Sequence, residues 1–549
     1  NDAGKKIGIT STNTNTRAAN GIFLEGNSHL NITGPVEIAK VHTKGSSAAG
    51  IAFQGSGSEA VIDGSLTISN VDGDKAEKQG RYIGVSGIRM TGDNTSMTVT
   101  GPVNISGFKG SALHTAGADS VISVGGGTIS TAADADKSHN FYAARVEKGT
   151  VNINMKNGAP GSARTNIIGD MYVTGQYGKK VIEYSGGQLA DWQHRGNLHV
   201  ALTDKDSSWT GVAAYEQYND NYGSGGNTMH DIGNFDLYLQ NGATWTNEQQ
   251  SHVTTTTLAG KNPVYNGSYL MKLHGGSDAV HKGYIYQKDS KPITVDNYSG
   301  HTLVFYDHTG DGSAAENYSA GDFRIKTAEE GSSITLRTGA GGINTADKTA
   351  AGKALNSLAN KLYYMSYAQG DTKLKGTVEI AEGLTSSSVS ASGDIAFRTD
   401  TAADKNGQGT YVYEPEEPLD GPIIKDRLLK GETTVTADDT HAEDGYVSAA
   451  YNGDDSITVD MANHGLRLEA DSSASAKAAA VRVGKGTDGN KKSISFINME
   501  KNKPLVISAD QTNGREATGI YVSENGKLSV AGDVVIDKVS TSGRMAYGV

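Results

Sequence analysis

The first 130 residues contain short segments in which apolar and other residues alternate. One copy of the pattern spans 21–24, 30–34 and 36–41, and related copies begin at Gly50 and Gly87. Alternation with a period of two residues predicts β-strands that bury one face. Glycines stand between the segments, where turns or close backbone approaches are expected. The pattern therefore predicts three short strands per copy.

Three strands that recur about every 25–37 residues are typical of a parallel β-helix, a solenoid of stacked coils. The known preference for right-handed parallel crossovers predicts a right-handed winding. One coil buries too few apolar side chains to fold alone, so stacking must supply the remaining stability. In the first copy the residues expected to face inward are Ile22, Leu24, Leu30, Ile32, Val36 and Ile38. Those expected to face outward are Phe23, Asn31 and Glu37.

A second repeat extends over a much longer distance. Residues 499–549 align without a gap with residues 1–51, and 19 of these 51 pairs are identical. Unrelated coils of one β-helix would share apolar positions but not the same spacing across two coils. We therefore expect a tandem repeat. We also expect the chain to be a segment of a longer polypeptide that contains at least two such units.

The chain is predicted to be all-β, a right-handed parallel β-helix with one short helical insertion. Apolar residues on one face predict that helix within residues 347–367. Three of the nine prolines fall in 415–422, a composition that interrupts sheets. The predicted parts are β-helix coils in 1–186, an aromatic-rich β-helix continuation in 187–345, a helix, strands and proline-rich linker in 346–425, and coils that start the second copy in 426–549.

Composition narrows the possible classes of protein. The 61 acidic and 49 basic residues give a net charge of −12 without extended basic patches, so we expect no nucleic-acid partner. No apolar run reaches 18 residues, and we therefore expect no membrane-spanning helix. The absence of cysteine excludes disulfides and thiolate zinc sites. It fits an exported protein that stays unfolded during transit, although compositional drift has the same result.

Four segments of the sequence resemble passenger regions of Gram-negative autotransporter adhesins. They are residues 237–245, 293–300, 355–364 and 376–385. The resemblance implies a secreted β-helical stalk that its own C-terminal membrane barrel carries to the outer surface. This chain lacks that barrel, which agrees with the expectation that it is a segment of a longer polypeptide. The serine motif Gly-Asp-Ser-Gly-Ser of the protease members is also missing from the sequence.

Motifs for catalysis, metals and cofactors give weak matches. Residues 484–489 fit a dinucleotide-binding glycine pattern, but a strand-like segment follows where that site needs a helix. Residues 307–318 begin like a calcium loop, but Tyr318 stands where a bidentate glutamate is required. The outward positions of the first three copies form no row of acidic residues. We therefore expect no catalytic residues, no metal site, no cofactor and no enzymatic activity.

The strongest candidate for binding is a segment that interrupts the coils between residues 215 and 227. It concentrates Tyr, Asn, Ser and Gly, which combine rigid aromatic area with adaptable polar groups. The alternative interpretation is a corner loop without a binding role. The predicted binding residues are Tyr215, Tyr218, Asn219, Asn221 and Tyr222.

These observations favour a non-catalytic adhesin stalk or passenger on the surface of a Gram-negative cell. The expected partner is a glycan or protein on host or bacterial surfaces, and self-association, as in a biofilm, is a further expectation. One alternative is a purely structural surface fibre or layer built of tandem repeats. Another is a secreted β-helical enzyme that acts on glycans.

Overall fold

The protein is described by a computed structural model that divides into two compact units, Asn1–Glu414 and Pro415–Val549. We call them the N-terminal and the C-terminal unit. The structure describes residues 6–15, 17–74, 77–78, 81–82, 84–107, 109–132, 141–173, 196–220, 227–231, 233–251, 264–307, 318–338, 348–380, 392–398, 407–411, 434–451, 456–461, 465–484, 492–497, 499, 503–523 and 526–549. Within these ranges the fold is all-β with one α-helix, and its large sheets are mostly parallel.

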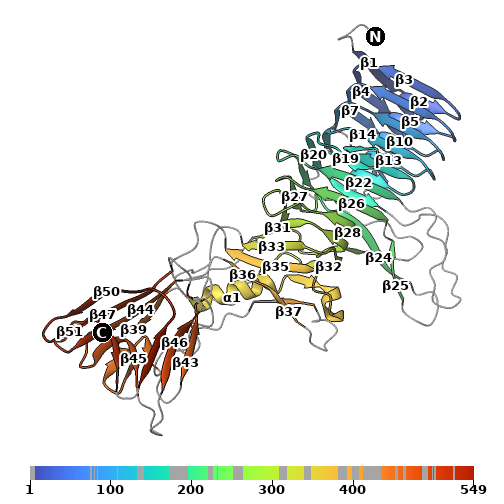
Figure 1. Cartoon of the computed structure of the whole chain (residues 1–549). Helices are drawn as coiled ribbons and strands as arrows, with labels where there is room; N and C mark the ends of the chain where they lie inside the picture. Colours follow the sequence, from blue (N-terminus) through green and yellow to red (C-terminus); the bar gives the residue numbers. More distant parts are fainter. Residues whose placement is uncertain are drawn as a thin grey trace. The chain divides into compact units, whose positions relative to one another are not determined.

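One sheet runs through the whole described part of the N-terminal unit. Its neighbouring strands are parallel, except for the last one, which is antiparallel. In spatial order the strands are β1 (Ile7–Asn13), β4 (Val36–Thr43), β7 (Leu66–Gly73), β12 (Val103–Ser106), β15 (Gly127–Ser130), β20 (Thr165–Ile168), β23 (Ser208–Thr210), β27 (Thr244–Asn247), β29 (Gly283–Gln287), β31 (His301–Tyr306), β33 (Ser332–Thr338), β35 (Leu374–Ile380) and β36 (Ser392–Asp394). Spatial order follows chain order, so the sheet grows by one strand per repeat (Figure 1).

The second large sheet of this unit consists of two ladders that merge at β28 (Val264–His274). One ladder contains β2 (Ala19–Glu25), β5 (Ala48–Gln54), β10 (Val85–Met90), β13 (Ser111–Thr115), β16 (Tyr142–Val146), β21 (Asp170–Val173) and β24 (Ala213–Asp220). The other contains β3 (His29–Thr33), β6 (Glu59–Asp63), β11 (Ser96–Val99), β14 (Val121–Val124), β17 (Thr150–Ile153), β22 (Asn197–Leu202) and β26 (Asn234–Leu239). After β28 follow β30 (Ile293–Ser299), β32 (Phe323–Ala328) and β34 (Leu362–Tyr364).

The pairing register confirms the strands that the alternation predicted. Equivalent residues of successive repeats lie opposite one another, as in the row Ile22, Ile51, Ile88 and Leu113. The predicted faces are also correct. Leu24, Val36 and Ile38 are buried, and Ile22, Leu30 and Ile32 are partly buried against the core. Phe23 is 47% exposed, Asn31 is exposed and Glu37 is half-buried.

Aromatic side chains fill part of the core of the N-terminal unit. Trp209 and Trp245 occupy equivalent positions on β23 and β27, are fully buried, and stack with ring centroids 4.8 Å apart. Their Nε1 atoms donate to the carbonyl oxygens of Gly169 and Gly211 at 3.0 and 2.9 Å. Gly211 has a φ of +154°, and a Cβ atom there would lie 2.2 Å from the Gly169 oxygen. The tryptophan layer therefore depends on a close backbone approach that glycine permits.

The helix predicted within 347–367 is confirmed only for its first part. Helix α1 spans Lys348–Ala359, whereas Leu362–Tyr364 forms strand β34 and Met365–Gln369 forms the 3₁₀-helix η1. Leu362 and Tyr364 are fully buried, and β34 pairs with β32. The prediction was wrong there because tertiary strand pairing overrode the local helical pattern. The proline-rich segment 415–422 lies outside the described residues.

Short antiparallel pairs complete the described part of the N-terminal unit. They are β8 (Glu77–Lys78) with β9 (Arg81–Tyr82), β18 (Met155–Lys156) with β19 (Ala159–Pro160), and β37 (Ala396–Phe397) with β38 (Gly409–Thr410). In the described ranges of both units, no helix is long and apolar enough to cross a membrane.

Three further sheets surround a separate core in the described residues of the C-terminal unit. The first, entirely parallel, contains β39 (Thr434–Ala437), β44 (Leu466–Ser472), β47 (Leu505–Gln511) and β50 (Val534–Thr541), and the 3₁₀-helix η3 (Asp439–His441) follows β39. The second contains β40 (Ala442–Glu443), β41 (Tyr446–Val447), β42 (Ala450–Tyr451), β45 (Lys477–Val483), β48 (Ala517–Val522) and β51 (Ala546–Tyr547). The third contains β43 (Ile457–Asp460), β46 (Ser493–Ile497) and β49 (Lys527–Val530).

The long sequence repeat has a structural counterpart. Strands β47 and β50 have the same bounds as β1 and β4 when 498 is added to the residue numbers. Each of the two strand pairs contains one register shift near its middle. The Thr43 hydroxyl donates to the Arg17 carbonyl, and the Thr541 hydroxyl donates to the Arg515 carbonyl in the same way. The two segments therefore share strand positions and a corner contact, as the alignment predicted.

Candidate functional site

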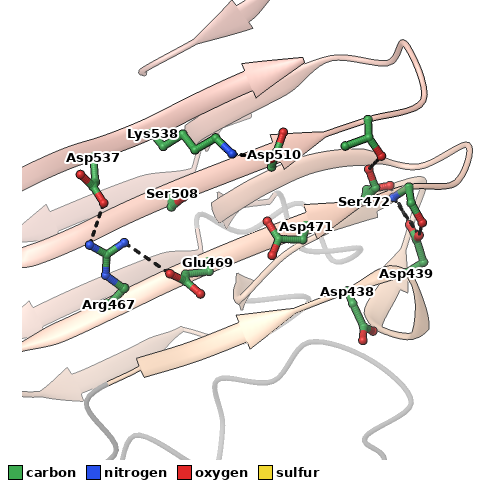
Figure 2. A pocket seen from close by; sticks show the side chains of 12 residues that line it. Asp438, Asp439, Arg467, Glu469, Asp471, Ser472, Ser508, Asp510, Asp537 and Lys538 are labelled. Atoms are coloured by element: carbon green, nitrogen blue, oxygen red, sulfur yellow. Dashed lines mark hydrogen bonds and ion pairs between the residues drawn. The ribbon is translucent and has the colours of Figure 1, made fainter. Parts of the chain in front are cut away.

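An open groove lies on the outer face of the parallel sheet of the C-terminal unit (Figure 2). Its volume is about 510 Å³, and we call it the acidic groove. Six carboxylates but only two cations line it, so its net charge is negative. The lining residues are Asp438, Asp439, Arg467, Glu469, Asp471, Ser472, Ser473, Ser508, Asp510, Thr512, Asp537 and Lys538.

Strand alternation explains why these side chains gather on one face. On β44, Leu466, Leu468 and Ala470 are buried in the core, and the intervening Arg467, Glu469 and Asp471 therefore point outward. Asp471 lies opposite Asp510 on β47 in the pairing register. Adjacent strands are about 4.8 Å apart, so these two carboxylates are direct neighbours on the outer face.

Two ion-pair groups neutralise part of the groove. Arg467 Nη2 lies 2.7 Å from an oxygen of Asp537, and Nη1 lies 3.3 Å from Glu469. Lys538 Nζ lies 2.5 Å from Asp510, and the hydrogen bond from Lys538 holds the pKa of Asp510 below its usual value. These pairs are largely exposed, so solvent screens them. The pair with Lys538 favours the ionised form of Asp510.

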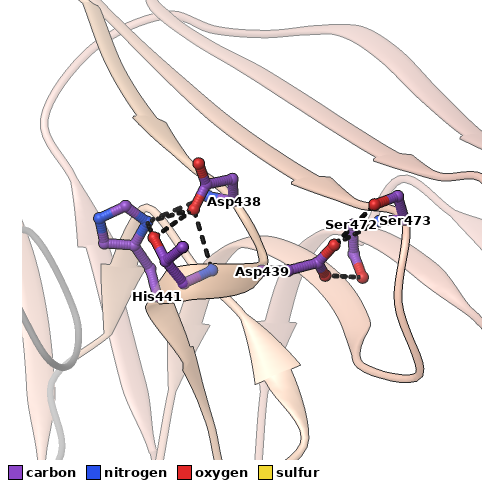
Figure 3. Close-up of polar contacts among 6 residues, drawn as sticks. Asp438, Asp439, His441, Ser472 and Ser473 are labelled. Carbon is purple, nitrogen blue, oxygen red and sulfur yellow. Dashed lines mark hydrogen bonds and ion pairs between the residues drawn. The ribbon is translucent and has the colours of Figure 1, made fainter.

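One end of the groove is formed by η3 and the turn after β44 (Figure 3). Asp439 accepts hydrogen bonds from Ser472 Oγ at 2.7 Å and from the Ser473 backbone N–H at 2.9 Å. Burial opposes the ionisation of Asp439, but these bonds outweigh it and lower its pKa. Asp438 caps η3, and a hydrogen bond from Thr440 lowers the pKa of Asp438. Both carboxylates are therefore held ionised by local donors.

Asp471, in the middle of the groove, has a different environment (Figure 2). Burial raises its pKa, and the nearby carboxylates of Glu469 and Asp510 raise it further. Among the described side chains, none donates a hydrogen bond to Asp471. The groove thus places a carboxyl that holds its proton more tightly than usual beside the ionised Asp510. Such a pair is suited to proton transfer as well as to hydrogen bonding with hydroxyl groups.

The described residues contain no group of three or more His, Asp or Glu side chains arranged to hold a metal ion. The calcium-like segment 307–318 lies mostly outside the described residues, as do residues 485–489 of the glycine motif. The expectations of no metal and no cofactor remain predictions.

The described residues of the predicted binding segment lie in an antiparallel strand pair. Tyr215, Tyr218 and Asn219 lie on β24, and the outer part of β24 pairs antiparallel with β25 (Asn227–Asp231) and with β28. The start of β24 belongs to the parallel ladder, where Ala213 pairs with Met171. Asn221 and Tyr222 lie outside the described residues, so the structure describes the backbone of three of the five predicted residues.

Sequence reasoning missed the acidic groove. The available signal was the recurrence of Asp five residues after the first core residue of a strand, as in Leu466–Asp471 and Leu505–Asp510. The outward positions compared for an acidic row belong to the first three copies of the repeat, and the groove lies outside these copies. At the equivalent positions of the first copy, Asp510 corresponds to Thr12 and Asp537 to Ala39. The first copy therefore lacks two of the six carboxylates that line the groove.

Comparison with protein-family models, curated proteins and solved structures gives no match for this chain.

Proposed function

We propose that the chain is part of a cell-surface adhesin, a non-catalytic passenger of the autotransporter type built as a right-handed parallel β-helix. The observation that carries the proposal is the regular parallel pairing of equivalent strands from one repeat to the next. Before β28 the chain returns to the same three ladders in each repeat, which favours a solenoid. The handedness follows from the rule for parallel crossovers.

This architecture suits a protein that must display binding surfaces away from a cell. Each layer is held by backbone hydrogen bonds and by burial between layers, so length can increase without a larger core. The outward positions are then free to vary. The segments 237–245 and 376–385 support the resemblance to passengers, and the implied location is the outer surface of a Gram-negative cell. Anchoring would come from a membrane barrel outside this chain.

We place the proposed binding site on the hairpin of β24 and β25. This hairpin leaves the parallel ladder and carries the Tyr- and Asn-rich sequence. Aromatic rings and amides match the stacking faces and hydroxyl groups of a glycan, and they also suit a protein surface. The proposed partner is therefore a glycan or protein on a host or bacterial cell.

Deleting residues 216–227 and joining the ends with a short Gly/Ser turn tests this proposal. The ladders should remain folded, because the removed residues of β24 pair with β25 and with the start of β28, whereas the ladder pairing of β24 lies at Ala213 and Ala214. Binding to a glycan array and to cultured host cells should fall to background. Replacing the exposed turn 277–281 in the same manner is the control, and it should leave binding unchanged. A folded deletion variant that binds as well as the parent would contradict the proposed site.

A second candidate function, glycan cleavage, is favoured by the acidic groove. Asp471 and Asp510 are neighbouring carboxylates with opposite pKa shifts, an arrangement found in acid–base catalysis on glycosidic bonds. Turnover of a polysaccharide by the intact protein, lost in Asp471→Asn, would support this candidate over the adhesin. A purely structural fibre would neither bind the array nor turn over glycans.

A further inference from the structure

Three aspartates form a row across the acidic groove. They are Asp438, Asp471 and Asp510, and each follows an alanine that pairs in register across β39, β44 and β47. The backbone of Asp438 is still extended, with φ −125° and ψ −171°. Adjacent strands are about 4.8 Å apart, so the row repeats a carboxylate at about that interval. Like charges at directly neighbouring positions repel one another, and cations beside the row would relieve that repulsion.

The three carboxylates of this row differ in the donors that surround them. Asp510 accepts a hydrogen bond from Lys538 Nζ, and Oδ1 of Asp438 accepts from the Thr440 backbone N–H at 3.0 Å. Asp471 lies between these two on the outer face (Figure 2), and among the described residues none donates to it. The middle of the row therefore lacks a donor.

Ser508 is a second, independent indication of a ligand site. Its neighbours Ile507 and Ala509 are buried in the core, and in the pairing register it lies between Glu469 of β44 and Lys538 of β50. Ser508 is only 8% exposed, yet it lines the groove (Figure 2), and no described group hydrogen-bonds to its hydroxyl. A largely buried hydroxyl without a partner costs free energy that a ligand in the groove can recover.

The charges and the chemistry of the lining favour an aliphatic cation. The carboxylates of Glu469, Asp510 and Asp438 all act on Asp471, and the charge of Lys538 opposes them. Negative charge thus prevails at the carboxylate that has no donor. The twelve lining residues are all polar or charged and include no aromatic side chain, so they offer no stacking face to a sugar ring.

We propose that the acidic groove binds a linear aliphatic polyamine, with one ammonium group next to Asp471 and Ser508 and another beside Asp438. An ammonium group has several N–H donors and no acceptor, so it complements a carboxylate and a hydroxyl that lack donors. By standard bond lengths, a spacer of three or four carbons holds two nitrogens about 5–6 Å apart, close to the interval of the row. This site does not depend on the proposed adhesin function, and it takes a different ligand from the glycan of the second candidate.

Titration calorimetry of the intact chain with spermidine measures binding at this site. Asp471→Asn keeps the shape of the side chain but removes its charge. It should raise the Kd at least about tenfold, the usual effect of losing one hydrogen bond to a charged group. Asp444→Asn is the matched control, because it removes one charge from the same unit outside the groove and should change the Kd less than about twofold. Equal weakening by the two substitutions, or no binding of spermidine to the parent, would overturn the proposal.

Ser508→Ala tests the hydroxyl while the charge of the groove stays the same. The Kd of spermidine should rise about three- to tenfold, and a Kd equal to that of the parent would contradict the placement of the ligand. A glucosamine trimer and a trilysine peptide present ammonium groups on other scaffolds, and both should bind more weakly than spermidine. Tighter binding of either one would show that the ligand is an amino-sugar glycan or a basic protein segment and not a polyamine.

Discussion

Ile62→Asp is expected to lower strongly the temperature at which the N-terminal unit unfolds. Ile62 lies on β6, is fully buried and pairs in register with Ile32 and Val99. A carboxylate there would have no polar partner, and the lost burial adds to that cost. We expect a loss of at least about 4 kcal/mol in the free energy of unfolding. Differential scanning calorimetry measures it directly.

The matched control is Val61→Asp on the same strand. Val61 is the outward neighbour of Ile62 and lies beside Asn31 and Thr98, so a carboxylate there reaches water. We expect a change below about 1 kcal/mol. The C-terminal unit has a separate core and should keep its own transition in both variants. Equal destabilisation by the two substitutions would show that the assigned faces are wrong.

Trp245→Ala is expected to destabilise the N-terminal unit by about 3–5 kcal/mol. The indole is fully buried, stacks on Trp209 and donates to the carbonyl of Gly211. Removing it leaves a large cavity in the middle of the ladder and a buried carbonyl without its donor. Chemical denaturation followed by tryptophan fluorescence of the remaining residues measures the loss.

Trp245→Phe separates the two contributions. Phenylalanine keeps an aromatic layer against Trp209 but cannot donate to Gly211. Its cost should be about 1–3 kcal/mol, clearly below that of Trp245→Ala. If both variants unfold at the denaturant concentration of the parent, the stacked layer does not contribute to the core as described.

Much of the fold could be predicted because one rule, alternation along each strand, acts locally. The inward assignment of Leu24, Val36 and Ile38 needed only the spacing of apolar residues. The end of the helix could not be predicted in this way. Leu362 and Tyr364 fit a helical face as well as a strand, and their pairing with β32, about 40 residues away, decided the outcome. A local sequence pattern carries no information about pairing between distant segments of the chain.

The acidic groove could not be predicted from the sequence for a related reason. Its residues come from three strands, from η3 and its cap, and from the turns after β44 and β47, and their proximity depends on the register between strands. A shift of one residue would turn Asp471 away from Asp510. By contrast, the hairpin at 216–231 had a local compositional signal.

An experimental density map of residues 1–414 that resolves individual strands tests the central claim most directly. The account predicts three parallel ladders up to β28, wound in a right-handed sense, with successive layers about 4.8 Å apart and the row Ile22, Ile51, Ile88 and Leu113 inside. A left-handed winding, or equivalent strands that do not pair with those of the next repeat, would contradict it.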